Sequence, residues 1–196
     1  MTSMTLANRI SLFRLFLIPV FVVLAAKYGL SVDKGTPQEW CRIAAVIVFL
    51  TASASDALDG WIARRFNQRS KLGSILDPLA DKSLMLSAII TLSVTGWSQE
   101  HRFPWWFPAL VILRDVLSTI GALMIKHRRG SVRIRPHWTG KVATVTQIVA
   151  IGWIMLRLEF IPPIVSTAIA AAFTVISGMA HLADGIRQYM HGAPAP

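Results

Sequence analysis

The sequence predicts an all-α integral membrane protein, with six transmembrane helices around a cytoplasm-facing polar cavity. The first observation is composition: of 196 residues, 54% are hydrophobic and only 15% are charged, whereas soluble domains carry about 25% charged residues. The second is a set of six mostly apolar stretches, each close to the roughly 20 residues that cross a bilayer. The third is a group of four aspartates in a chain that otherwise suits lipid.

The six apolar stretches take up most of the chain. They lie near residues 10–27, 39–63, 73–96, 105–126, 138–157 and 162–187. Six spans of roughly 20 residues use about 120 residues, so only short connections remain. We therefore expect one membrane domain over residues 1–196. In the first stretch the apolar core follows Arg9 and Arg14, as it would in a signal peptide, but the apolar run is long, so we expect a retained span.

The lysines and arginines predict how the spans are oriented. The formal net charge is +10, and the positive charges gather in the loops after the second and fourth stretches. These residues are Arg64, Arg65, Arg69, Lys71, Lys126, Arg128, Arg129, Arg133, Arg135 and Lys141. Cytoplasmic loops of membrane proteins carry such an excess, so both termini are expected in the cytoplasm. In so apolar a chain the charge favours anionic lipids over nucleic acid as partners. A bacterial cytoplasmic membrane is the expected location, with a mitochondrial inner membrane as the alternative.

The four aspartates fall at the junction of the second and third stretches. Asp56 and Asp59 are three residues apart, and Asp77 and Asp81 are four apart. Both spacings place side chains on one face of a helix. A cytoplasmic loop lets the two helices run antiparallel, so we expect the carboxylates to meet at the cytoplasmic boundary. Close carboxylates repel one another and resist desolvation. They favour a hard divalent cation such as Mg²⁺, Mn²⁺ or Ca²⁺, and the lack of histidine among these four residues disfavours zinc or copper.

The spacing of these residues resembles a known family signature. The stretch "DALDGWIARRFNQRSKLGSILDPLAD" fits D-x2-D-G-x2-A-R-x8-G-x3-D-x3-D at every position, which is the pattern of the CDP-alcohol phosphotransferase family. The resemblance covers essentially the whole chain. It implies transfer of a phosphatidyl or similar group from a CDP-linked donor to an alcohol, with release of CMP. It also implies Mg²⁺ or Mn²⁺ as cofactor, six helices around a cytoplasm-facing cavity, and a homodimer.

The same resemblance implies roles for the motif residues. Asp56, Asp59 and Asp77 match metal ligands that contact the diphosphate, and Asp81 matches the general base, which would also contact a second metal ion. The CDP-binding residues would be Asp56, Asp59, Gly60, Ala63, Arg64 and Gly73. No serine or cysteine nucleophile is indicated. Direct displacement at the lipid-side phosphorus is therefore the expected mechanism.

Basic residues outside the motif are candidates for binding the acceptor alcohol. Arg114 lies in the middle of the fourth stretch, where a charged side chain is costly to bury and is therefore expected to be functional or paired. Its neighbour Asp115 points about 100° away around a helix, so we expect the two not to be direct partners. Arg133, Arg135 and Lys141 lie at the expected cytoplasmic entrance. Topology and attraction to anionic lipids are the other explanation for these three.

Two subfamilies compete for the choice of acceptor. The segments "NRISLFRLFLIPVF" and "HWTGKVATVTQ" resemble phosphatidylglycerophosphate synthases, which use glycerol 3-phosphate. The segments "RSKLGSILDPLADK", "RDV" and "GKVATVTQ" also resemble cardiolipin synthases of the same superfamily, which use phosphatidylglycerol. The first subfamily commonly has Arg-Glu where this chain has Arg114-Asp115. We expect transfer from CDP-diacylglycerol to glycerol 3-phosphate, with phosphatidylglycerol as the alternative acceptor. A cation transporter is a distant alternative, because it would need polar residues across the whole bilayer.

Overall fold

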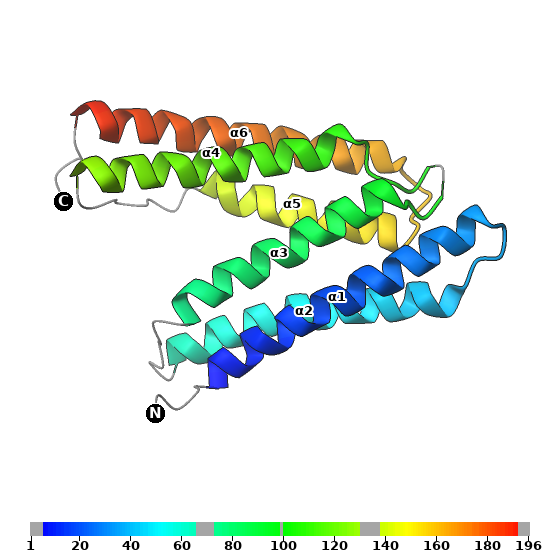
Figure 1. Ribbon diagram of the computed structural model, residues 1–196. Helices are drawn as coiled ribbons and strands as arrows, with labels where there is room; N and C mark the ends of the chain where they lie inside the picture. The colour runs from blue at the N-terminus through cyan, green and yellow to red at the C-terminus, as the bar shows by residue number, and fades with distance from the viewer. Residues whose placement is uncertain (1–5, 66–72, 99, 130–137, 192–196) are drawn as a thin grey trace. The chain divides into compact units, whose positions relative to one another are not determined.

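A computed structural model describes residues 6–65, 73–98, 100–129 and 138–191 (Figure 1). Over these residues the chain is all-helical, and the six predicted helical segments are confirmed. The helices are α1 Leu6–Asp33, α2 Glu39–Arg65, α3 Gly73–Val94, α4 Trp106–Arg129, α5 Trp138–Met155 and α6 Pro163–His191.

The helix ends differ from the predicted ones most in α1 and α6, and α6 ends at His191 rather than at the expected residue 187. α1 begins and ends several residues beyond the expected apolar run 10–27, because backbone hydrogen bonding continues into polar residues that hydropathy leaves out. α5 ends at Met155, two residues before the expected end. Arg157 has a φ of 51°, in the left-handed region, which a right-handed helix cannot include.

The chain forms two compact units. Unit 1 comprises Met1–Arg102 with Ile154–Arg157, and unit 2 comprises Phe103–Trp153 with Leu158–Pro196. Helices α1 to α3 therefore belong to unit 1, and α4, α6 and all of α5 except its last two residues belong to unit 2. The expectation of a single membrane domain over 1–196 stays a prediction, and the units are described separately below.

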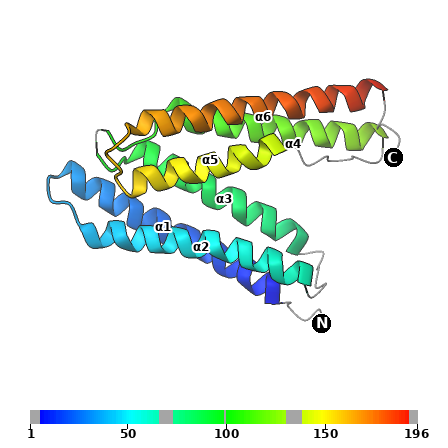
Figure 2. The same ribbon diagram turned by 180° about the vertical axis from the view of Figure 1, so that it is seen from behind.

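In unit 1, α1 packs against both other helices. It runs antiparallel to α2 and in the same direction as α3 (Figures 1 and 2). The rings of Phe21 and Phe49 meet across α1 and α2 with centroids 5.7 Å apart. Ala25 of α1, Ala45 of α2 and Ala88 of α3 are also completely buried. Small residues of this kind let helix backbones approach closely, as they do in membrane proteins.

The chain segments of unit 1 approach closely where α1 meets the residues just after α3. A Cβ atom added at Gly29 would lie 2.5 Å from the carbonyl oxygen of Gly96 and 2.8 Å from the Cβ of Thr95. Beside this crossing, the indole Nε1 of Trp97 donates a 3.2 Å hydrogen bond to the carbonyl oxygen of Ala25. The Trp97 ring also packs edge-on against Tyr28. Only glycine fits at position 29 without moving one of the two backbones.

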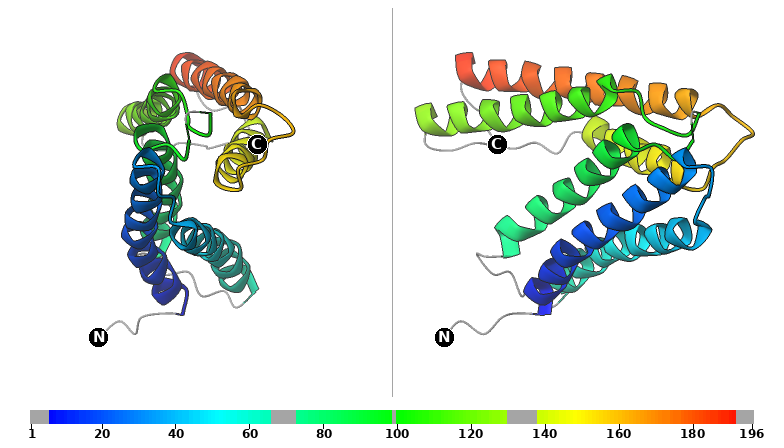
Figure 3. Two further views of the ribbon diagram at one scale, coloured as in Figure 1. Left: turned by 90° about the vertical axis from the view of Figure 1, so that its right-hand side faces the viewer. Right: turned by 45° about the vertical axis from the view of Figure 1, so that its right-hand side comes forward.

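In unit 2, α4 and α6 pack side by side and run in the same direction, while α5 runs the opposite way (Figure 3). The buried face of α6 is unusually polar for so apolar a helix. Thr167, Thr174 and Ser177 on this helix are each completely buried. Buried hydroxyls of this kind need hydrogen-bond partners inside the protein.

Length and composition allow two of the helical segments to cross a bilayer, Leu12–Asp33 and Pro163–Ile186. That test covered the described residues only. Transmembrane placement of the six helices stays a prediction, and so does the cytoplasm-facing cavity.

Candidate functional site

The motif positions lie at one end of unit 1. Asp56, Asp59, Gly60, Ala63 and Arg64 occupy the last turns of α2, and Gly73, Asp77 and Asp81 the first turns of α3. The end of α2, the start of α3 and the start of α1 lie at the same end of this unit in all views (Figures 1 to 3). The side chains of these eight residues are outside the described part of the structure. Their roles stay predictions, but their backbone positions fit a shared site.

The helical register of α2 and α3 predicts which helix face carries the motif positions. The buried residues of α2 recur at Cys41, Ala45, Phe49 and Ala52. Continuing in steps of three or four residues gives positions 56, 59 and 63. On α3 the buried residues Ala80, Leu84 and Ala88 continue backward to positions 77 and 73. Position 81 lies three and four residues before buried Leu84 and Met85.

A buried arginine on α1 lies level with this end of α2. The Arg14 side chain has 0% exposure. From the contact between Phe21 and Phe49, seven residues toward the start of α1 lead to Arg14. Seven residues toward the end of the antiparallel α2 lead to position 56. Sequence reasoning took Arg14 for a charged flank of the first span. The available signal was an arginine inside "ISLFRLFLIPVF", an otherwise apolar run.

The chemistry of the motif fits a hard divalent cation. Four carboxylate-bearing positions at two adjacent helix ends supply only oxygen ligands, which Mg²⁺ and Mn²⁺ prefer. Among the described side chains, no other group of three or more His, Cys, Asp or Glu residues could hold a metal ion. If the protein binds such a cation, the motif is therefore the best-supported place for it.

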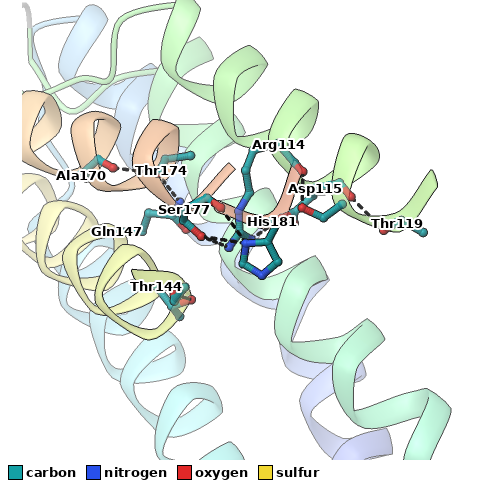
Figure 4. A network of polar contacts seen from close by, with 11 residues as sticks. Arg114, Asp115, Thr119, Thr144, Gln147, Ala170, Thr174, Ser177 and His181 are labelled. Carbon is teal, nitrogen blue, oxygen red and sulfur yellow. Dashed lines mark hydrogen bonds and ion pairs between the residues drawn. The ribbon is translucent and has the colours of Figure 1, made fainter. Parts of the chain in front are cut away.

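In unit 2, Arg114 of α4 is held by two partners (Figure 4). Its Nη1 donates a 2.8 Å hydrogen bond to Oδ1 of Asp115, and its Nη2 donates a 2.7 Å hydrogen bond to Oγ of Ser177 on α6. The expectation that Arg114 and Asp115 are not direct partners is therefore wrong. Their Cβ atoms diverge around the helix, but the arginine side chain is long enough to curl back. Pairing also satisfies two charges that are largely removed from water.

The Arg114 guanidinium keeps donors available for a further ligand. Its side chain is 19% exposed, and its buried Nε finds no hydrogen-bond partner among the described residues. Each Nη carries a second hydrogen, so only two of the five donors are used by these contacts. A guanidinium with free forked donors suits a phosphate oxyanion.

Two glycines border this guanidinium. A Cβ atom added at Gly178 of α6 would lie 3.4 Å from Cγ of Arg114, so the arginine stem rests against α6. A Cβ atom added at Gly140 of α5 would lie 3.6 Å from Nη2 of Arg114 and 3.4 Å from Cε1 of His181. Three helices of unit 2 thus converge at Arg114.

Sequence reasoning missed the contribution of α6. The Nδ1–H of His181 donates a 2.6 Å hydrogen bond to the carbonyl oxygen of Ser177. One turn earlier, Nε2 of Gln147 on α5 donates a 2.8 Å hydrogen bond to Thr174 (Figure 4). The signal in the sequence was Ser177 and His181, four residues apart in an apolar helix.

The other predicted acceptor residues are less well placed by the structure. Lys141 is exposed on the first turn of α5, next to Gly140. Arg133 and Arg135 lie outside the described residues. Acceptor binding by these three stays a prediction.

Comparison with known proteins adds a family match over most of the chain. A family model described as CDP-alcohol phosphatidyltransferase matches residues 4–180. This region contains the whole aspartate motif and also Arg114 and Ser177.

Individual relatives are similar along most of their length. A protein of Mycobacterium tuberculosis named "Probable phosphatidylglycerophosphate synthase" is 37% identical over 185 residues, which cover 93% of this chain and 82% of the relative. A Shigella flexneri protein named CDP-diacylglycerol–glycerol-3-phosphate 3-phosphatidyltransferase is 33% identical, with 88% and 90% covered. An Escherichia coli protein of the same name is 35% identical, with 76% and 75% covered.

Proposed function

This chain belongs to the CDP-alcohol phosphatidyltransferase family, and on that premise we propose the reaction that it catalyses. The protein transfers a phosphatidyl group from CDP-diacylglycerol to glycerol 3-phosphate and releases CMP. The observation that carries this function is the similarity to the three relatives, which extends over at least three quarters of each chain. The intact eight-residue motif supports the same reaction class.

The names of the relatives favour glycerol 3-phosphate as the acceptor. Two of the three state it directly, and none of the three states phosphatidylglycerol. The similarity to these relatives spans the region that contains Arg114-Asp115. The alternative acceptor, phosphatidylglycerol, therefore has no support from these relatives.

The chemistry of donor activation is assigned to unit 1. Asp56, Asp59 and Asp77 would bind Mg²⁺ or Mn²⁺, with Asp81 as a further ligand. The residues Gly60, Ala63, Arg64 and Gly73 would bind the CDP group together with Asp56 and Asp59. When bound, the divalent cation supplies charge neutralisation at the diphosphate.

Asp81 is the residue proposed to handle the proton. It takes the proton from the acceptor hydroxyl as that oxygen forms its bond to the lipid-side phosphorus. The bond from this phosphorus to the bridging diphosphate oxygen breaks, and CMP leaves with the electron pair. No covalent enzyme intermediate is required.

Acceptor binding is assigned to unit 2. The unused donors of Arg114 would bind the phosphate of glycerol 3-phosphate, and the arrangement of Asp115 and Ser177 supports this by holding the guanidinium in place. Lys141, Arg133 and Arg135 would add positive charge for the same dianion. Electrostatic attraction of this kind raises the local concentration of an anionic substrate.

The proposed setting is the cytoplasmic membrane of a bacterium. Exposed large apolar side chains lie on all six helices, for example Phe16, Ile47, Val94, Leu117 and Val149. A water-soluble fold would bury most such side chains, whereas a bilayer solvates them. We propose six spans around a cytoplasm-facing cavity, cytoplasmic termini, contact with anionic lipids, and a homodimer.

An acceptor panel tests the proposed function. Purified protein in detergent is mixed with CDP-diacylglycerol and Mg²⁺, and CMP release is measured with glycerol 3-phosphate or with phosphatidylglycerol. Release that depends on glycerol 3-phosphate is expected. Release only with phosphatidylglycerol would overturn the choice of acceptor, and release with neither would overturn the reaction.

Metal removal tests the cofactor assignment. Dialysis against EDTA should abolish CMP release, and added Mg²⁺ or Mn²⁺ should restore it. Full activity in EDTA, with the metal content of the sample verified by elemental analysis, would contradict the assignment.

A further inference from the structure

We propose that Ser177 is a positioning residue that fixes the Arg114 guanidinium for recognition of the acceptor phosphate. This inference rests on the proposed function, in which Arg114 binds that phosphate. Ser177 itself need not touch the acceptor. It sets the affinity for glycerol 3-phosphate through the orientation of Arg114.

The hydrogen bonds of Ser177 differ from those of neighbouring hydroxyl residues. On α6, the hydroxyls of Ser166, Thr167 and Thr174 each donate to a backbone carbonyl three or four residues earlier. This back-bonding is the usual way for Ser and Thr to satisfy their hydroxyls in apolar helices. The described contacts of Ser177 Oγ are instead to Arg114 Nη2 at 2.7 Å and to His181 Nδ1 at 3.4 Å. The Ser177 hydroxyl therefore hydrogen-bonds to the arginine rather than to the backbone of its own helix.

Two anchors on different nitrogens fix the plane of a guanidinium. Asp115 holds Nη1, and Ser177 holds Nη2. With only the Asp115 anchor, the group could rotate about its bond to Asp115 and along its flexible stem. With both, the remaining donors point in one set of directions before the ligand arrives. Such preorganisation raises affinity by lowering the entropy that binding removes.

The packing around Ser177 supports an orienting role. Its side chain is completely buried, so water does not compete for its hydroxyl. The next residue, Gly178, leaves room for the arginine stem, with its added Cβ only 3.4 Å from Cγ of Arg114. Ser177 thus binds the guanidinium of Arg114, and Gly178 leaves room for the aliphatic part of its side chain against α6.

The matched test compares Ser177→Ala with Thr174→Val. Thr174 is equally buried, lies one turn away on the same face, and bonds Gln147 and the Ala170 carbonyl rather than Arg114. Ser177→Ala should raise KM for glycerol 3-phosphate about tenfold, the effect of one hydrogen bond to a charged group. Its kcat and its KM for CDP-diacylglycerol should stay within twofold. Thr174→Val should leave all three constants within twofold.

A double-mutant cycle tests whether Ser177 acts through Arg114. In the Arg114→Lys background, Ser177→Ala should add little further increase in KM, because the fork that it orients is gone. Additive effects would overturn the proposal, as would an unchanged KM in Ser177→Ala alone. Ser177→Thr, which keeps a hydroxyl, should retain a lower KM than Ser177→Ala. If wild-type protein does not use glycerol 3-phosphate at all, the proposed function fails, which is a different result from an unchanged KM.

Discussion

The Nη2 atom of Arg114 donates a 2.7 Å hydrogen bond to the Oγ atom of Ser177, joining α4 to α6 inside unit 2. The other nitrogen, Nη1, is paired with Asp115 at 2.8 Å. A charge in the middle of an apolar helix is costly unless it is paired or used. Here it is paired on two sides and still has donors to spare, which is the arrangement expected of an anion receptor.

Asp115→Asn should destabilise the protein. The amide keeps the size of the carboxylate but removes the negative charge that faces Arg114, leaving a largely buried cation with a weaker partner. We expect a loss of about 1–3 kcal/mol in the free energy of unfolding. Denaturation in detergent measures it. Asp33→Asn, at the exposed end of α1, is the control, and equal stability of the two variants would contradict the expectation.

Gly140→Ala should weaken acceptor binding without harming the fold. The added methyl group would lie 3.4 to 3.6 Å from His181, Arg114 and Ser177, which is ordinary van der Waals contact. It would nevertheless fill space beside the guanidinium. We expect KM for glycerol 3-phosphate to rise severalfold at an unchanged melting temperature. Gly152→Ala on the same helix meets nothing within 4 Å, and a matching KM change in that variant would refute the steric explanation.

Gly29→Ala should destabilise unit 1. Its Cβ would lie 2.5 Å from a backbone oxygen and 2.8 Å from the Cβ of Thr95, so one helix must move. Overpacking of this kind costs about 1–3 kcal/mol and occasionally more. Gly121→Ala on α4 meets nothing within 4 Å and should be neutral, or stabilising by up to about 1 kcal/mol. The melting temperatures of the two variants decide, and a Gly29→Ala protein as stable as wild type would show that α1 and α3 do not approach so closely.

Arg14→Met should lower kcat more than it changes either KM. Arg14 is completely buried and level with position 56, so we expect its charge to help balance the carboxylates of the motif. We expect a fall of at least about tenfold in kcat, in line with the loss of a buried charge partner. Arg14→Lys, which keeps the charge, should retain more activity than Arg14→Met. Wild-type kcat in a folded Arg14→Met protein would limit Arg14 to a packing role.

Sequence reasoning predicted the helices well because each one carries an apolar run of about the length that it needs to be stable in lipid. It placed the start of α2 at 39 and of α3 at 73, as the structure does. Several ends were misplaced: α1 ends at Asp33 rather than at residue 27, and α6 at His191 rather than at residue 187. α5 ends at Met155, just before the left-handed backbone at Arg157. No pattern of hydropathy reports a single φ angle.

The motif could be found in the sequence because its fixed spacing along two helices can be read without knowing the tertiary structure.

The surroundings of Arg114 could not be predicted from the sequence. A helical wheel gives Cβ directions, and from these Arg114 and Asp115 diverge, but it does not show how far a long side chain can bend. The contact with Ser177 joins residues that are 63 positions apart, and Arg14 was hidden for the same reason. Its burial depends on how α1 packs, which no local pattern records.

The central claim is that this protein joins glycerol 3-phosphate to the phosphatidyl group of CDP-diacylglycerol, with Asp81 as the base. The most direct measurement follows isotope from labelled glycerol 3-phosphate into extracted lipid while CMP is counted in the same sample. We predict one labelled lipid per CMP for wild type and for Asp33→Asn, and a fall of about 10²–10⁴-fold for Asp81→Asn. CMP release with no label in the lipid fraction, or full activity in Asp81→Asn, would contradict the account.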